Sequence, residues 1–233
     1  MTEKISVILP CYNEKENILK LVPVIHEVLS KYNHEILVVD DNSPDGTYQE
    51  LKKMNYAYVV PILRETDRGF AKSIRCGIEK ASGEILVVMD SDFNHQPRYL
   101  PVLIDNIKYF DCVIASRFVY FPVEKHYSLF RIITSWMYNL FIRIILRSGV
   151  TENLFGFFSI RKEVVYKLDF DKIFFGFGDY FIRLLFYLQK DNRSILQIPA
   201  IFGQRNAGTG NKNLMRRIFR YTKETFILRF KNL

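Results

Sequence analysis

Short apolar runs rich in valine and isoleucine alternate with amphipathic segments through the first half of the chain, and this order limits the possible folds most. The runs predict strands at residues 4–9, 35–40, 58–63, 84–89 and 112–116. The segments between them predict helices near residues 15–31, 45–54, 70–81 and 98–108. Alternating strands and helices build a parallel sheet that is covered on both faces. We therefore expect an α/β fold with a mostly parallel central sheet.

Composition fits a single domain in a reducing compartment. With 233 residues, 48% of them hydrophobic, the chain can bury one sizeable core. Its three cysteines, Cys11, Cys76 and Cys112, lie far apart without a CxxC pair. This pattern argues against a disulfide framework or a zinc site and favours the cytoplasm. The first apolar run, about five residues long, is too short for a signal peptide, so we expect no cleaved leader.

Polar side chains cluster where the predicted strands end, in the stretches PCYNE, DDNSPDGT, DSDFN and SRF. Because parallel strands end at one edge of a sheet, where ligands bind, these clusters are expected to meet. A single aspartate at a strand end could simply cap the following helix. Two strands that end in acid pairs, Asp40 with Asp41 and Asp90 with Asp92, favour a ligand site instead.

The four acids at the strand ends would repel one another, so we expect a divalent ion or a positively charged group among them. Oxygen ligands favour Mg²⁺ or Mn²⁺, and such ions usually complete their coordination shell with substrate phosphates. The residue types therefore predict a site that handles a phosphorylated ligand.

Four stretches in this order, LPCYNEKENI, VVDDNSPDGT, GEILVVMDSDFNHQP and SRF, resemble the nucleotide-sugar-binding half of the family 2 glycosyltransferases. The branch that transfers mannose or glucose to dolichyl or polyprenyl phosphate is the most similar. The resemblance runs from about residue 4 to residue 212. It implies a Rossmann-like GT-A fold and transfer of a hexose, with inversion, from a nucleotide diphosphate such as GDP-mannose or UDP-glucose.

The resemblance also implies where the donor binds. It places the nucleotide base and ribose at Pro10, Tyr12, Glu14, Val39 and Asp41. It identifies Asp90, Ser91 and Asp92 as the DxD segment, which contacts the ribose and the metal-bound diphosphate. Asn94 stands where the family often has a glutamine that faces the metal. The expected metal ligands are thus Asp90, Asp92 and Asn94, with Mg²⁺ or Mn²⁺ as the cofactor.

Two arginines, Arg117 and Arg205, match family positions that contact donor or acceptor phosphate, and Lys212 is expected to join Arg205 on the acceptor phosphate. Either arginine could instead form an ordinary surface salt bridge. A lipid monophosphate is largely dianionic at pH 7, so the reaction needs no catalytic base. Asp179 matches an acid near the acceptor site, although it could merely favour the helix dipole.

The acceptor side also departs from the family pattern. Asn153 stands where relatives usually carry aspartate, and Phe155 replaces a small residue. The neighbouring Glu152 could substitute for the missing acid.

Two segments point to a membrane surface. Residues 212–233 carry seven cations and one acid, a net charge of +6 out of +8 for the chain, which argues against a general nucleic-acid-binding face. Residues 128–147 are apolar but interrupted by Arg131 and Arg143, too short for a spanning helix. We expect a catalytic domain over 1–212 with interfacial amphipathic helices at 128–147, and a basic helix over 213–233. Both segments could instead be packed core helices.

The expected location is therefore the cytoplasmic face of a membrane, with peripheral contact. A homo-oligomer or a membrane-protein partner stays open.

Within the fold, the alternative is a transferase that uses a glycan acceptor. A DxD-type phosphatase usually carries its motif on the first strand, with Thr or Val two residues after the second aspartate, where this chain has Asn94. A dinucleotide oxidoreductase needs a GxGxxG turn after strand one, which is absent, and a membrane adaptor would not explain the strand-end acids.

Overall fold

The structure is a computed structural model that describes residues 3–119, 129–203 and 214–231. A seven-stranded sheet forms its centre, in the order β3-β2-β1-β4-β6-β5-β7. The strands are β1 (Ile5–Cys11), β2 (His34–Asp40), β3 (Val59–Leu63), β4 (Ile85–Val88), β5 (Cys112–Ser116), β6 (Phe158–Arg161) and β7 (Ile195–Pro199). Only β6 runs antiparallel to its neighbours in this sheet. The expected mostly parallel sheet is confirmed.

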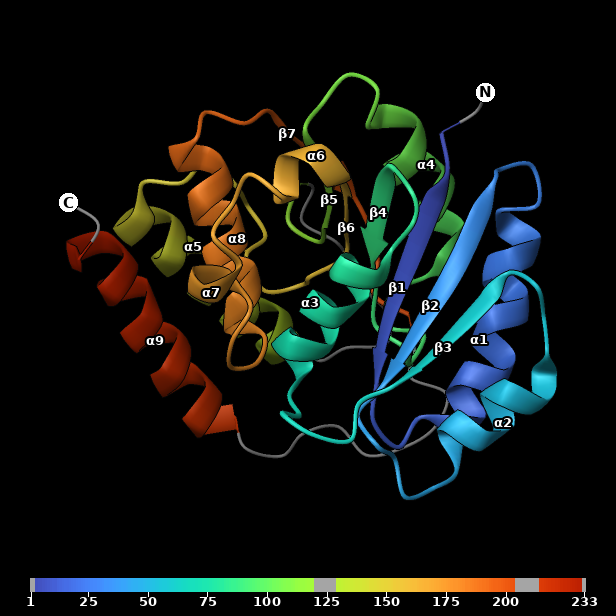
Figure 1. The fold of residues 1–233 in the computed structure, drawn as a ribbon. Coiled ribbons are helices and arrows are strands. Elements are labelled where there is room, and N and C mark those ends of the chain that lie inside the picture. The colour runs from blue at the N-terminus through green and yellow to red at the C-terminus, as the bar shows by residue number, and fades with distance from the viewer. Residues whose placement is uncertain (1–2, 120–128, 204–213, 232–233) are drawn as a thin grey trace.

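Helices cover both faces of the sheet (Figure 1). They are α1 (Lys15–Val28), α2 (Thr47–Met54), α3 (Phe70–Lys80), α4 (Leu100–Asn106), α5 (Leu129–Leu146), α6 (Lys162–Val165), α7 (Phe170–Ile173), α8 (Asp179–Lys190) and α9 (Leu214–Lys231), with a 3₁₀ turn η1 (Pro97–Tyr99). All five strands and four helices expected in the first half are present. Helix α2 begins two residues late, because Gly46 has a left-handed φ of 80° and the Asp45 carboxylate accepts a hydrogen bond from the Thr47 amide at 3.0 Å.

Alternating side chains of each strand enter two separate cores, as the period of two requires. On β1, Val7 and Leu9 pack with α1 and α4, whereas Ile8 packs with α3 and α8. On β2, Val38 joins the first core and Val39 the second. Both cores are closed to solvent, so the sheet is a rigid base for the residues that follow its strands.

The antiparallel strand β6 brings a distant segment to the site. Because it runs against β4 and β5, its amino end lies at the same edge as their carboxyl ends. Residues 152–157, just before β6, therefore lie beside the segments that follow β4 and β5. The sequence pattern did not predict this strand, which has only four residues.

Helices α5, α8 and α9 pack together outside the sheet, through a cluster centred on Ile142, Ile182 and Leu228. In Figure 1, α9 (red) lies along the outer side of this group. The Tyr138 hydroxyl of α5 donates to the Ile218 carbonyl of α9 at 3.1 Å. One face of α9 is thus part of the folded domain.

The other faces of α5 and α9 expose apolar side chains at helical spacing. We call this set the α5/α9 apolar surface: Leu129, Phe130, Ile133, Trp136, Met137, Ile144, Met215, Phe219, Phe226 and Phe230. Among the described residues, α5 is the one helix whose length and composition would allow it to cross a membrane, and 17% of it is buried in the protein. A helix so little buried does not behave as an ordinary core helix.

Candidate active site

The segments after β1, β2, β4 and β5 meet at one edge of the sheet, as expected. Pro10 and Val39 pair in register on β1 and β2. The Val39 side chain is fully buried in the core, so the atoms of Val39 available at this edge belong to its backbone. The Ser91 hydroxyl donates to the Pro10 carbonyl at 3.1 Å and joins the end of β1 to the DxD segment.

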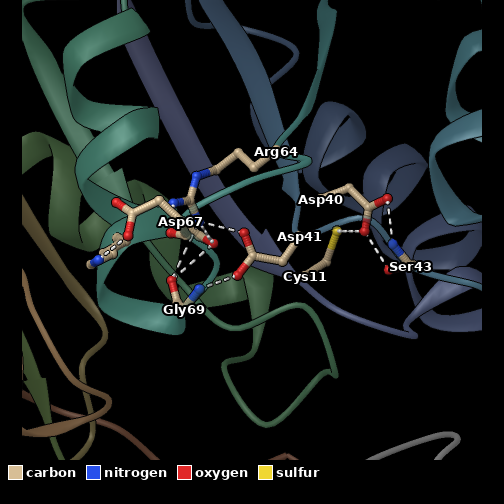
Figure 2. A network of polar contacts seen from close by, with 9 residues as sticks. Cys11, Asp40, Asp41, Ser43, Arg64, Asp67 and Gly69 are labelled. Atoms are coloured by element: carbon tan, nitrogen blue, oxygen red, sulfur yellow. Dashed lines mark hydrogen bonds and ion pairs between the residues drawn. The ribbon is translucent and has the colours of Figure 1, made fainter.

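Asp40 holds the turn that follows β2 (Figure 2). Its carboxylate accepts hydrogen bonds from the Ser43 amide at 3.2 Å and from the Ser43 hydroxyl, and the Cys11 thiol lies 3.7 Å away. Burial, reinforced by the Asp40 charge, raises the pKa of Cys11 well above its ordinary value, so the thiol stays protonated. Asp40 is fully buried, and its bonds serve the turn.

Asp41 forms a nearly buried ion pair with Arg64, the first residue after β3 (Figure 2). The other carboxylate oxygen of Asp41 accepts from the Gly69 amide at 2.7 Å. Arg64 also donates to the Ser73 hydroxyl at 2.9 Å and to the Asp67 carbonyl. Asp41 therefore fixes the loop between β3 and α3. Sequence reasoning missed Arg64, although its place directly after a strand was a usable signal.

Tyr12 is 48% exposed, and the guanidinium of Arg68 lies 4.7 Å from the centre of its ring. Arg68 belongs to the loop that Asp41 and Arg64 hold. Glu14 stands at the start of α1, where its carboxylate accepts a hydrogen bond from the side-chain Nδ2 of Asn17. Of the residues expected to contact the base and ribose, Tyr12 presents the largest exposed side chain.

The DxD segment leaves β4 in a compact turn. Ser91 and Asp92 are nearly buried, whereas the Asp90 side chain is 36% exposed. The Asp92 carboxylate accepts from the backbone amide of Asn94 at 3.1 Å and from its side-chain Nδ2 at 2.7 Å. The amide oxygen of Asn94, the atom that could bind a metal, is therefore not the one bonded to Asp92.

His95, which sequence reasoning overlooked, lies fully buried behind this turn. Its Nδ1 accepts the Asp90 amide at 2.8 Å, and its ring stacks on Phe157 and meets the edge of Phe155. Burial is the main reason that the pKa of His95 falls to about 4, although Asp92 opposes the shift. The imidazole is thus neutral at neutral pH.

Gly203 contacts the same turn from the other side. Its amide donates to the Asn94 carbonyl at 2.8 Å, and a Cβ added at this position would lie 1.9 Å from the Phe93 carbonyl oxygen. Only glycine can approach the backbone so closely. The predicted contacts Arg205 and Lys212 follow this residue and lie outside the described residues.

Arg117, just after β5, forms a nearly buried ion pair with Glu152. Its Nε and Nη2 donate to the two carboxylate oxygens at 2.6 and 2.9 Å, and Glu152 is fully buried. Nη2 also donates to the Ser135 hydroxyl of α5 at 3.2 Å. The guanidinium lies against Phe155 and Phe202 at 5.3 and 4.5 Å from the ring centres. The pair is an interior one, unlike an ordinary surface salt bridge.

Asp179 begins α8 and is the centre of a buried ion network. Its carboxylate accepts from Arg183 at 2.8 Å, from Arg220 of α9 at 3.1 Å and from the Phe177 amide at 2.8 Å. The next residue, Tyr180, has its pKa raised by burial and by the charge of Asp90. The Asp179 carboxylate thus links α8 to α9.

The residue types of the DxD segment fit a divalent metal ion. Two carboxylates and an amide, from Asp90, Asp92 and Asn94, are hard oxygen donors within one turn. In the part of the chain that the structure describes, no group of three or more His, Cys, Asp or Glu residues is arranged to hold a metal ion. Magnesium and manganese ions that bind few protein oxygens usually complete their coordination with phosphate oxygens and water.

Comparison with protein families identifies residues 6–169 as a match to the model of glycosyl transferase family 2. The chain is 34% identical over 229 residues to a dolichol-phosphate mannosyltransferase of Pyrococcus furiosus, a match that covers 97% of the chain and 63% of that protein. The chain thus spans less than two thirds of this relative's length. It is 29% identical over 214 residues to a polyprenol monophosphomannose synthase of Mycolicibacterium smegmatis, covering 89% of the chain and 80% of that protein.

Solved structures share the fold. One is glucosyl-3-phosphoglycerate synthase of Mycobacterium tuberculosis in complex with Mn²⁺, UDP and phosphoglyceric acid. It superposes on the present structure with a TM-score of 0.73 at 21% identity, and the match covers 97% of the present protein and 78% of the synthase. The complex of the same enzyme with Mg²⁺ and UDP gives a TM-score of 0.71 at 19% identity, and this match covers 97% of the present protein and 79% of the synthase. The expected GT-A-like fold is confirmed.

Proposed function

The chain belongs to glycosyltransferase family 2, and from this premise we propose that it transfers a hexose from a nucleotide diphosphate sugar to a polyprenyl or dolichyl phosphate. The names of the relatives from Pyrococcus furiosus and Mycolicibacterium smegmatis support a lipid phosphate as the acceptor. The Mn²⁺ and Mg²⁺ bound with UDP in the neighbouring structures support a divalent metal cofactor. The donor is of the GDP-mannose or UDP-glucose type, and the transfer inverts the sugar.

The donor half of the proposal uses the edge of the sheet. Tyr12 offers an exposed aromatic face for the base, while Pro10, Glu14, Val39 and Asp41 line or brace the same region. Asp90, Ser91 and Asp92 face the ribose and the diphosphate. A metal held by Asp90, Asp92 and Asn94 would neutralise the charge that develops on the departing diphosphate.

One observation carries the acceptor half of the proposal: the Arg117 guanidinium at the sheet edge bonds to Ser135 of α5 at 3.2 Å. It thereby links a cation near the DxD segment to the helix with the exposed apolar face. A lipid whose chain rests on α5 would bring its phosphate to Arg117. Nε and Nη2 of Arg117 bond to Glu152 and Ser135, so the phosphate is assigned to the remaining nitrogen, Nη1, of this guanidinium. Arg205 and Lys212 are proposed to join Arg117 at this phosphate.

The acceptor phosphate needs no base, because its second pKa near 6 leaves it largely dianionic at neutral pH. The residues of the chain then act by orienting the two phosphates and excluding water. Asp179 is proposed to act at the acceptor side by fixing the start of α8, since its carboxylate is bonded to Arg183 and Arg220.

Membrane contact is proposed through the α5/α9 apolar surface. Phe130, Trp136 and Phe219 are among its exposed side chains, and α9 adds arginines and lysines that attract anionic lipid. The protein would act as a peripheral protein at the cytoplasmic face, where nucleotide sugars and the lipid phosphate can meet.

A donor panel tests the function. Purified protein in detergent is given short polyprenyl phosphate with GDP-mannose or UDP-glucose, and with Mg²⁺, Mn²⁺ or EDTA. Transfer from one of these donors, lost in EDTA, is expected. Asp92→Asn should lower turnover by about a hundredfold or more, the size expected when a major electrostatic stabiliser is lost. The exposed Asp191→Asn is the matched control and should keep wild-type turnover.

The same panel, extended with a glycan acceptor and with phosphomonoesters, separates the alternatives. Transfer to a glycan with none to polyprenyl phosphate would favour a glycan acceptor over the proposed lipid. Release of inorganic phosphate from phosphomonoesters, with no sugar transfer, would favour a DxD-type phosphatase. Undiminished transfer in EDTA would contradict the metal requirement.

A further inference from the structure

His95 is an unexpected residue to find where it lies. Its side chain is 0% exposed, its ring stacks on Phe157 with centres 4.8 Å apart, and it meets the edge of Phe155 at 4.4 Å. An apolar side chain could fill this space without the cost of burying a polar ring. A hydrogen bond made by the ring would explain why a histidine, and not an apolar residue, occupies this position.

The hydrogen bond that the His95 ring accepts comes from Asp90. The Asp90 amide donates to His95 Nδ1 at 2.8 Å, and an amide can only donate, so Nδ1 is the acceptor and Nε2 carries the proton. Nε2 lies 3.5 Å from the Asp90 carboxylate. The amide of Met89, one residue earlier, still donates to the Ile8 carbonyl of β1. His95 therefore accepts the first backbone amide after the last hydrogen bond between β4 and β1.

We propose that His95 is a positioning residue for the DxD segment: its Nδ1 holds the Asp90 amide so that Asp90 and Asp92 leave β4 in the shape that binds a metal and a nucleotide diphosphate. The inference rests on the proposed function, because it concerns the segment to which we assign that ligand. Phe155 and Phe157, which precede β6, fix the plane of the imidazole. Phe155 also lies against Arg117, so one aromatic group supports both halves of the site.

Three substitutions separate positioning from simple packing. His95→Asn keeps an acceptor at the position of Nδ1 but loses the ring, whereas His95→Leu fills the space and removes the acceptor. His95→Gln carries its polar atoms one bond further out. The measurements are thermal unfolding and calorimetric titration with GDP and with UDP, each in Mn²⁺ and in EDTA.

Removing the bond should weaken Mn²⁺-dependent nucleotide binding by about tenfold or more, the usual effect of losing a partner that orients a metal site. We expect this loss in His95→Leu and His95→Gln, with nucleotide binding in EDTA unchanged. His95→Asn should stay within about threefold of wild type, although its lost packing makes it no more stable than His95→Leu. Nucleotide binding that follows thermal stability across the three variants would overturn the proposal.

Two further results keep the proposal falsifiable. Nitrogen-15 spectra of the wild-type protein should show His95 protonated at Nε2, and protonation at Nδ1 would overturn the proposal even if no variant folded. Wild-type protein that binds neither GDP nor UDP more tightly in Mn²⁺ than in EDTA would overturn the proposed function itself. Wild-type binding that requires Mn²⁺, together with unchanged binding by His95→Leu, would overturn only the role of His95.

Discussion

Arg117 and Glu152 are bonded through two hydrogen bonds of 2.6 and 2.9 Å, although 35 residues separate them in the sequence. Arg117 follows β5, and Glu152 precedes the antiparallel strand β6. Their side chains are 12% and 0% exposed. The pair therefore joins the two segments that frame the proposed acceptor side and does so away from bulk water.

Removing the acid of this pair should destabilise the fold. Glu152→Gln leaves the Arg117 charge buried without its partner, a loss of about 3 kcal/mol in the free energy of unfolding. Urea unfolding at pH 7 measures the effect. Glu79→Gln, which removes the acid of an exposed pair with Arg75, should cost less than about 1 kcal/mol. Equal losses of unfolding free energy in the two variants would show that the interior pair stabilises the fold no more than the exposed pair does.

A side chain at Gly203 should displace the DxD turn. In Gly203→Ala, the new Cβ would meet the Phe93 carbonyl, and relieving that contact should cost about 1–3 kcal/mol of stability. Since the turn also holds Asp92 and Asn94, Mn²⁺-dependent nucleotide binding should weaken. Gly149→Ala is the matched control, because nothing lies within 4 Å of a Cβ at that position. Weakened nucleotide binding by both variants would contradict a specific role for Gly203.

Lowering the pH should reduce the free energy of unfolding by protonating Glu35, which lies at the start of β2, at the edge of the sheet opposite the candidate site. Burial alone would raise the pKa of this carboxyl, but hydrogen bonds from Ser6, Ser82 and Lys4 outweigh burial and lower the pKa to about 2. A lowered pKa means that the stabilisation is complete above the ordinary value of 4.5 and is lost as the pH falls toward 2. Its size is at most about 3 kcal/mol.

Urea unfolding of wild type and Glu35→Gln at several pH values tests this. The difference between their free energies of unfolding should be largest near pH 7 and should shrink steadily below pH 4.5. A difference that stays constant down to pH 2.5 would mean that the Glu35 charge contributes nothing, and that the glutamine merely packs poorly.

The sequence predicted the first half of the fold well, because each buried strand there is a continuous apolar run followed by its own helix. The strand ends also met as expected, since parallel strands place Asp41, Asp90 and Ser116 at one edge by topology alone. The short antiparallel strand β6 could not be predicted, because its four residues lack a distinctive period and its pairing is set by distant neighbours.

Bonding partners could not be read from the sequence for a related reason. His95 lies in a polar stretch, and the rings that pack on it, Phe155 and Phe157, come some sixty residues later. Asp179 begins α8, as one of the two alternatives for this residue had it, but its partner Arg220 lies on α9. The donor-side and acceptor-side roles assigned to individual residues stay predictions.

The α5/α9 apolar surface should bind membranes, and the single tryptophan of the chain, Trp136, reports on it directly. Trp136 is 39% exposed, so its fluorescence should shift to shorter wavelength when α5 enters a bilayer. Binding should be stronger to anionic than to neutral liposomes and should weaken with salt, because the cations of α9 contribute about 1 kcal/mol each near an anionic surface. Flotation of the liposomes measures binding independently.

Surface substitutions test this surface better than truncation. Deleting residues 214–233 would remove Leu228 and Thr225, which are buried, and would expose Ile142 and Ile182, so a truncated protein should unfold more easily whatever the helix binds.

Phe130→Ser combined with Phe219→Ser removes two side chains that are 77% and 72% exposed and should leave stability nearly unchanged. This variant should lose most of its flotation with anionic liposomes. Tyr109→Ser, at a 71% exposed site in the turn before β5, is the control and should float like wild type. Equal flotation by all three proteins would rule out this surface as the membrane contact and leave the donor site unaffected.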